Sequence, residues 1–278
     1  MNADKTVLVE KKGFIGYIIL NRPEKLNALT DPMYMELLRA VDYMEEQEDI
    51  RVVVVKGAGR CFSAGFDVAS SDTSDHMAER RNYDRGCHLA RKKLWSLPKP
   101  TIAQVHSHCL GGAHDIALAC DLCVVAENAH MGVPEIQFGL GATFLAMPYM
   151  IHLRKCKEYL LTGKSYDGKT AVEMGIANYC VPLEELDDTV VKLAKELAGV
   201  PVPSMVMQKR AINRAVENMG FSVMAEQWLD TLCMGVLWES EDITRFNEKV
   251  AELGTKGAIK WRNDCLEQMM QRNVEDET

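Results

Sequence analysis

A run of four consecutive valines, Val52–Val55, limits the fold of this chain more than any other segment. Continuous β-branched runs are typical of strands covered on both faces, as in parallel sheets. A second apolar run, Phe14–Leu20, predicts another strand. Between the two, a Thr30-Asp31-Pro32 start signal precedes apolar residues at helical spacing over residues 33–48. We therefore predict a strand–helix–strand unit with a parallel sheet.

The rest of the chain divides into a part that alternates strands with helices and a part that is mostly helical. Thr101–Val105 and Asp121–Ala126 predict strands on either side of a helix from about Ala113 to Cys120. From about Leu145 onward, the sequence predicts helices near residues 171–175, 183–198, 204–218, 222–237 and 240–253. No linker rich in Pro, Gly or Ser separates the two parts, and we expect an α/β fold.

Charge and cysteine content exclude several classes of protein. The chain has 278 residues, with 32 Lys and Arg against 40 Asp and Glu, and a formal charge of −8 without a basic tail argues against a nucleic-acid partner. The nine cysteines, an odd number among apolar neighbours, favour reduced thiols over a disulfide framework. The first residues, MNADKTVLVEKK, contain no apolar signal region, and no run of about eighteen apolar residues follows. We therefore expect a cytoplasmic protein without a membrane partner.

Glycine-rich turns follow the predicted strands. The first, Gly57–Val68 (GAGRCFSAGFDV), has neither the GxGxxG pattern of dinucleotide sites nor the GxxxxGK[ST] pattern of phosphate loops. The second, His106–Gly112 (HSHCLGG), places two glycines before a helix, where backbone N–H groups and the helix dipole favour an anion. A third loop, Gly132–Glu135, ends in a carboxylate. The histidines around the second turn match no zinc pattern, and we expect no metal site.

Six segments, in order, resemble the enoyl-CoA hydratase/isomerase, or crotonase, superfamily. They are residues 21–29 (NRPEKLNAL), 62–67 (FSAGFD), 98–121 (PKPTIAQVHSHCLGGAHDIALACD), 132–135 (GVPE), 161–164 (LTGK) and 171–177 (AVEMGIA). The resemblance implies a crotonase-like spiral of repeated ββα units over residues 1–200. It also implies that residues 201–278 form a C-terminal helical region that builds homotrimers or homohexamers. The implied substrate is an acyl-CoA thioester, with no cofactor beyond its coenzyme A moiety.

The same resemblance assigns roles to single residues. The backbone N–H groups of Phe66 and Gly112 would form an oxyanion hole, and two such fixed donors can strongly stabilise an enolate oxygen. Asp115 and Glu135 fall where hydratases of this family carry two glutamates. Adding water needs one group that deprotonates water and one that returns a proton to Cα, and the two carboxylates could divide that work. The residues expected along the coenzyme A path are Arg22, Lys25, Ala28, Ala64, Asp67 and Gly111.

Several residues depart from the pattern of the family. Asp115 is one methylene shorter than the usual glutamate, and hydroxycinnamoyl-CoA hydratase-lyases carry serine there. Dienoyl-CoA isomerases also have Asp at that position, but they use a further Asp where this chain has Thr143. The segment Gly139–Met147 lacks the glycine-rich stretch of fatty-acyl hydratases, which favours a cyclic or aromatic acyl group. The residues expected to line the acyl pocket are His114, Thr143, Phe144 and Trp238.

Three functions remain open from the sequence. A lyase that hydrates a 2-enoyl-CoA is favoured, because the oxyanion donors and both carboxylates are present. A hydrolase, isomerase or C–C lyase acting on a ring or hydroxyacyl thioester is the second interpretation. A catalytically inactive coenzyme A-binding or RNA-binding relative is the third, and the intact carboxylate pair argues against it.

Overall fold

The computed structural model describes residues 5–67, 83–139, 141–236 and 240–271. A six-stranded sheet has the order β1-β2-β3-β4-β6-β9, and a smaller sheet has the order β5-β7-β8. The strands of the large sheet are β1 (Val7–Lys12), β2 (Ile15–Leu20), β3 (Val52–Gly57), β4 (Thr101–Val105), β6 (Leu122–Ala126) and β9 (Tyr179–Val181). Those of the small sheet are β5 (His108–Leu110), β7 (His130–Gly132) and β8 (Tyr166–Asp167).

The predicted strand–helix–strand unit is confirmed. Strands β2 and β3 pair in parallel, and α1 (Asp31–Glu46) connects them. The Thr30 side chain caps this helix by accepting a hydrogen bond from the Met33 N–H at 3.4 Å. Strand β1 was not predicted; it pairs antiparallel with β2 across a turn at Gly13, whose φ is +61°. Its outer residues are exposed, so its sequence shows little of the apolar pattern of a buried strand.

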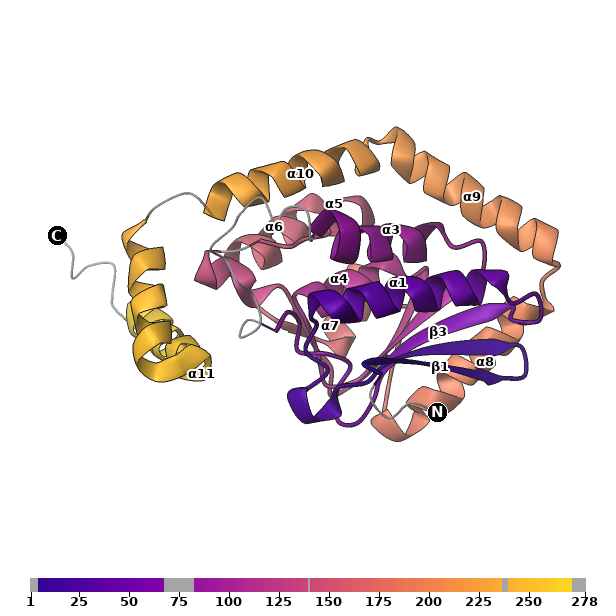
Figure 1. Ribbon diagram of the computed structural model, residues 1–278, viewed down its shortest axis with the longest axis horizontal. Helices are drawn as coiled ribbons and strands as arrows, with labels where there is room; N and C mark the ends of the chain where they lie inside the picture. The colour runs from indigo at the N-terminus through magenta and orange to yellow at the C-terminus, as the bar shows by residue number, and fades with distance from the viewer. Residues whose placement is uncertain (1–4, 68–82, 140, 237–239, 272–278) are drawn as a thin grey trace.

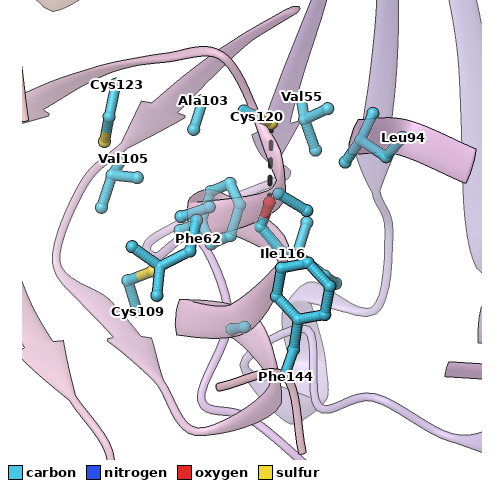
Figure 2. Close-up of a cluster of buried hydrophobic side chains, with 14 of the residues drawn as sticks. Val55, Phe62, Leu94, Ala103, Val105, Cys109, Ile116, Cys120, Cys123 and Phe144 are labelled. Atoms are coloured by element: carbon cyan, nitrogen blue, oxygen red, sulfur yellow. Dashed lines mark hydrogen bonds between the residues drawn. The ribbon is translucent and has the colours of Figure 1, made fainter. Parts of the chain in front are cut away.

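The valine run is covered on both faces, as predicted (Figure 1). Val53 and Val55 face a core shared with α1, α3 (Leu89–Ser96) and α4 (Gly112–Ala119). Val52 and Val54 face a second core, which α8 (Leu186–Gly199) closes from the other side. Figure 2 shows part of the first core, where Phe62, Ile116 and several cysteines pack together. The described cysteines therefore act mainly as small apolar side chains.

The small sheet places two of the glycine-containing segments side by side. Strand β5 leads into α4 through Gly111, and β7 leads into the short 3-10 helix η4 (Pro134–Phe138). The two strands run parallel with Leu110 opposite Gly132, and the Gly111 N–H donates to the Gly132 carbonyl at 2.8 Å. Because parallel strands end at the same edge, the turn before α4 and the start of η4 meet there.

The second half of the chain is mainly helical, as predicted. Its elements are α5 (Met147–Met150), α6 (Leu153–Thr162), α7 (Gly168–Met174), η5 (Leu183–Glu185), α8, α9 (Val202–Asn218), α10 (Phe221–Val236) and α11 (Glu241–Gln271). Helix α11 consists of two helical segments that meet at a non-helical residue, Gly254 (φ +69°, ψ +167°), so the first segment ends where the sequence predicted, at Leu253. Helices α9 and α10 follow one side of the molecule, and α11 lies beyond them (Figure 1). No helix in the described ranges is long and apolar enough to cross a membrane.

Among the described residues between β2 and β4, three helical elements were not predicted. The 3-10 helix η1 (Pro23–Lys25) follows β2, and the π-helical segment η3 (Tyr83–His88) runs directly into α3. Helix α3 packs against α1 and α4. Ala90 and Leu94 are buried in the core and Trp95 packs against it. Leu89 is exposed and two lysines separate these positions, so the sequence of α3 carries a weak helical pattern.

Replacing Asn27 by alanine is expected to destabilise the protein by about 3 kcal/mol, because it leaves buried carbonyls without a donor. Asn27 is fully buried at φ +53°, and its Nδ2 contacts the carbonyls of Ala58, Cys61 and Phe62 at 2.8–3.1 Å. Urea unfolding of N27A measures the change. N21A, which removes one exposed hydrogen bond to the Lys5 carbonyl, is the control. Equal midpoints for the two variants would contradict the prediction.

Candidate active site

The turn before α4 and the carboxylate of Glu135 are in direct contact. Gly111 has φ +53° and ψ −122°, a conformation that side-chain-bearing residues rarely adopt. A Cβ built on Gly111 would lie 1.4 Å from Glu135 Oε1, so the carboxylate occupies the space that a side chain would need. Glycine is therefore required at this position for two reasons: the backbone has a positive φ, and a side chain would clash with the Glu135 carboxylate.

Glu135 is a carboxyl group held away from water. Its residue is half-buried on η4, and its Oε2 is buried without a hydrogen-bond partner among the described residues. Burial raises the pKa of Glu135 to about 8; the charge of Asp115 adds to the rise and that of Arg91 opposes it. A carboxyl group with such a pKa can both take and give a proton near neutral pH.

Phe66 and Gly112 lie beside each other, as the resemblance implied. The Leu29 N–H donates to the Gly65 carbonyl and the Asp67 N–H to the Leu29 carbonyl, both at 2.8 Å, which fixes the backbone on either side of Phe66. A Cβ built on Gly112 would lie 2.7 Å from the Phe66 ring and from the Tyr34 hydroxyl. As the first residue of α4, Gly112 has no intrahelical acceptor for its N–H. The helix dipole favours negative charge at that position.

Asp115 lies one turn into α4 and belongs to a buried polar network, although its Oδ1 has no hydrogen-bond partner among the described residues. Its Oδ2 accepts from the Thr143 N–H at 3.1 Å and from the Thr143 hydroxyl at 2.8 Å. Arg91 Nη1 lies 3.5 Å from the same oxygen, and both side chains are fully buried. Burial raises the pKa of Asp115, while the Arg91 charge and the hydrogen bonds from Thr143 and the Phe144 backbone limit the rise. The predicted second carboxylate therefore has a cation as its direct neighbour.

Arg91 and Tyr34 were not predicted from the sequence. Arg91 donates to the Thr143 hydroxyl and to the Tyr34 hydroxyl, each at 2.7 Å. Its guanidinium also lies 5.2 Å from the Tyr34 ring centre and 5.7 Å from that of Phe66. In the sequence, Arg91 precedes two lysines and resembles an exposed basic helix face, so only the packing of α1 against α3 identifies it.

The structure describes three of the four residues predicted to line the acyl pocket. His114 is buried, its Nε2 lies 2.5 Å from the Tyr166 hydroxyl, and burial lowers its pKa to about 4. Phe144 is buried against the ring of Phe221 on α10, 5.4 Å between ring centres. Trp238 lies outside the described residues. Trp228, also on α10, donates from Nε1 to the Ala142 carbonyl at 2.5 Å, so a C-terminal helix does contact the segment that carries Thr143.

The residues predicted along the coenzyme A path gather around the loop after β2. Arg22 Nη1 donates to the Ala28 carbonyl at 2.6 Å and to Asp67 at 3.0 Å. The Ala64 N–H donates to the Leu26 carbonyl at 3.0 Å, and Gly111, in the turn before α4, lies next to this loop, with its Cα 3.7 Å from a Cβ built on Gly65. The ion pair with Asp67 offsets the charge of Arg22, whereas Lys25 is exposed.

Known proteins resemble this chain over most of its length. The family model "Enoyl-CoA hydratase/isomerase" matches residues 10–250. A hydroxycinnamoyl-CoA hydratase-lyase of Pseudomonas fluorescens is 34% identical over 200 residues, covering 69% of this chain and 72% of that protein. A probable mitochondrial enoyl-CoA hydratase of Dictyostelium discoideum is 33% identical and covers 88% of each chain. The crystal structure of an enoyl-CoA hydratase/isomerase from Xanthobacter autotrophicus Py2 superposes with a TM-score of 0.85 at 32% identity, covering 93% of this chain and 97% of that one.

Proposed function

This chain belongs to the enoyl-CoA hydratase/isomerase family and has the crotonase-like α/β fold, and from this premise we propose that it adds water to the double bond of a 2-enoyl-CoA. The observation that carries the proposal is the direct contact between the Glu135 carboxyl group and the turn that begins α4. A proton-exchanging acid thereby adjoins backbone donors suited to an enolate oxygen.

The proposed reaction has two steps. The Glu135 carboxylate takes a proton from water, the resulting hydroxide forms a bond to Cβ, and the π-electron pair moves onto the thioester oxygen as an enolate. The N–H groups of Phe66 and Gly112 stabilise that oxygen, with the dipole of α4 adding to the effect. The protonated carboxyl of Glu135 then returns the proton to Cα, which restores the carboxylate.

A panel of straight, branched, cyclic and aromatic 2-enoyl-CoA esters tests the proposal. Incubation with the purified protein is expected to add 18 mass units to at least one member, the mass of water, detected by mass spectrometry. If every ester is recovered unchanged, the assignment is wrong and an inactive relative that only binds coenzyme A is favoured.

The rate of hydration is expected to rise with pH through a midpoint near 8. The carboxylate is the active form of Glu135, and its pKa of about 8 means that the protonated form dominates below that pH. For a single ionisation, kcat/KM then rises about tenfold between pH 7 and pH 9. Initial rates over pH 6–9 measure the profile, with the enzyme-free rate subtracted and activity checked after return to pH 7. A profile that is flat or falls over this range would contradict it.

Cleavage of the hydrated product is a second candidate function. The similarity to a hydroxycinnamoyl-CoA hydratase-lyase favours it. In such a step the Cα–Cβ bond of the β-hydroxyacyl thioester breaks, giving an aldehyde and a shortened acyl-CoA. Product analysis separates the two functions, because hydration retains all carbon atoms in one thioester and cleavage does not.

The remaining properties of the enzyme are proposed with it. Arg22, Lys25, Ala28, Ala64, Asp67 and Gly111 would border the coenzyme A moiety, and the reaction would need neither a metal nor a further cofactor. We propose His114, Thr143, Phe144 and Trp238 for the acyl pocket, and a cyclic or aromatic acyl group. The core would comprise residues 1–200, and residues 201–278 would assemble a cytoplasmic homotrimer or homohexamer.

A further inference from the structure

A fully buried arginine adjoins the candidate site, and the proposed reaction does not use it. Arg91 has no exposed surface, and its two terminal nitrogens donate to Tyr34 and Thr143. The Thr143 hydroxyl accepts from Arg91 at 2.7 Å and donates to Asp115 at 2.8 Å, so it bridges the two charged groups. The network therefore runs from α1 through α3 to the N-terminal turn of α4.

Because Arg91 is buried, its positive charge needs the neighbouring Asp115 carboxylate as a counter-charge. A guanidinium remains protonated in proteins, and a buried cation without a counter-charge is strongly unfavourable. Asp115, 3.5 Å away, is the carboxylate that pairs with Arg91 among the described residues. The other titratable groups that interact with Asp115 are Tyr34 on α1, Cys87 on η3, Cys109 on β5 and Glu135 on η4. Burial raises the pKa of the two thiols and the phenol, so these groups stay neutral and leave Asp115 as the counter-charge.

We propose that Arg91 is a positioning residue that holds Asp115 as a fixed carboxylate outside the proton transfers, so that Glu135 alone takes the proton from water and returns it to Cα. The inference rests on the proposed hydration. It changes the role that the sequence suggested for Asp115, from a group that exchanges protons to a fixed negative charge.

The environment of the two carboxyl groups supports this division. A proton on Asp115 would remove the counter-charge of Arg91 in the middle of the reaction. No salt bridge with Glu135 is found in the described part of the chain, and its Oε2 has no hydrogen-bond partner there. Glu135 can therefore change its protonation state without breaking an ion pair.

The test compares the pH profiles of D115N and of the double variant R91M/D115N with that of the unmodified enzyme. In D115N, Arg91 loses its partner and its positive charge favours the Glu135 carboxylate, so the midpoint of kcat is expected to fall by about 1 pH unit. In the double variant both charges are absent, and the midpoint is expected to return to the original value. The rate at high pH is expected to stay within about threefold of the original in both variants, because the proton-exchanging group is intact.

If D115N does not fold, R91M/D115N still tests the proposal, because removing both charges leaves no unpaired charge in the core. The double variant K209M/D121N is the control, since Lys209 and Asp121 form another ion pair, 2.6 Å apart, beyond the C-terminal end of α4, in which Lys209 is buried and Asp121 is partly exposed. It is expected to leave the midpoint unchanged. A folded R91M/D115N enzyme whose high-pH rate falls a hundredfold would overturn the proposal, and so would an unshifted midpoint in D115N.

A measurement without turnover separates this inference from the proposed function. If the unmodified enzyme hydrates no ester, the proposed function fails. The carboxyl signal of Asp115, labelled with carbon-13 and assigned by its loss in D115N, still reports the ion pair. Its titration midpoint is expected to rise by more than about 1 pH unit in R91M, because burial then acts without the opposing cation. An unchanged midpoint would show that Arg91 does not hold Asp115 ionised.

Discussion

Replacing Glu135 by glutamine is expected to lower kcat for hydration at least about a thousandfold, because one group carries both proton transfers. Glutamine has nearly the same shape and preserves the contact with Gly111, but it cannot take a proton from water. KM is expected to change little, since the thioester oxygen would still contact the donors of Phe66 and Gly112. Steady-state kinetics at pH 8–9, where the unmodified enzyme is most active, measures the change.

The same variant is expected to be more stable than the unmodified protein at neutral pH. The pKa of Glu135 is about 8 in the folded protein, against an ordinary value of 4.5. Folding must therefore protonate this group or desolvate its charge. The free energy of unfolding consequently falls as the pH rises from about 4.5 to 8. Glutamine removes that cost, which is about 3 kcal/mol at pH 7. Q137A is the control on the same short helix, because the Gln137 side chain donates to the Thr162 carbonyl and does not contact the turn before α4 in the described structure. E135Q with a tenth of the original kcat would contradict the assignment of Glu135.

Replacing Gly111 by alanine is expected to abolish measurable hydration. The added Cβ would meet Glu135 Oε1 at 1.4 Å, so the carboxylate has to move away from the turn. The backbone conformation, φ +53° and ψ −122°, is also strained for alanine, and together these effects are expected to cost about 3 kcal/mol of stability. Activity assays and urea unfolding of G111A measure the two effects separately.

Gly175 provides the matched control. It also has a positive φ, +82°, but a Cβ there would meet no atom within 4 Å. G175A is therefore expected to lose about 1 kcal/mol of stability through strain alone and to keep its activity. If G111A hydrates substrate as well as G175A does, the contact between the turn and Glu135 is not needed for the reaction.

Most of the fold could be predicted because burial leaves a strong local pattern. The valine run and the capped helix before it specify a parallel unit, and the structure confirms both. Strand β1 was missed because its outward residues are charged, and the three-residue strands of the small sheet are too short for a periodic signal. The predicted helix end at Leu253 coincides with a break in α11 at Gly254, and the second helical segment that follows it was not predicted.

The candidate site could be predicted only where its residues lie in recognisable segments. Gly111, Gly112 and Glu135 lie in two segments that the resemblance assigned to one site. The register of β5 with β7 brings these segments into contact. Arg91 and Tyr34 lie in no such segment. Their importance follows from burial, which depends on how α1 packs on α3.

The sequence by itself determined the parallel sheet and the glycine turn before α4, because apolar periodicity and turn residues are local properties. The pairing of β5 with β7 then places Glu135 beside that turn. Only the tertiary structure decided what charge each carboxyl group carries, because a pKa depends on burial and on neighbours distant in the chain. Glu135 lies against a glycine turn and has no counter-ion among the described residues, whereas Asp115 lies against Arg91. Two acids that are equivalent in the sequence are therefore unlike in the folded protein.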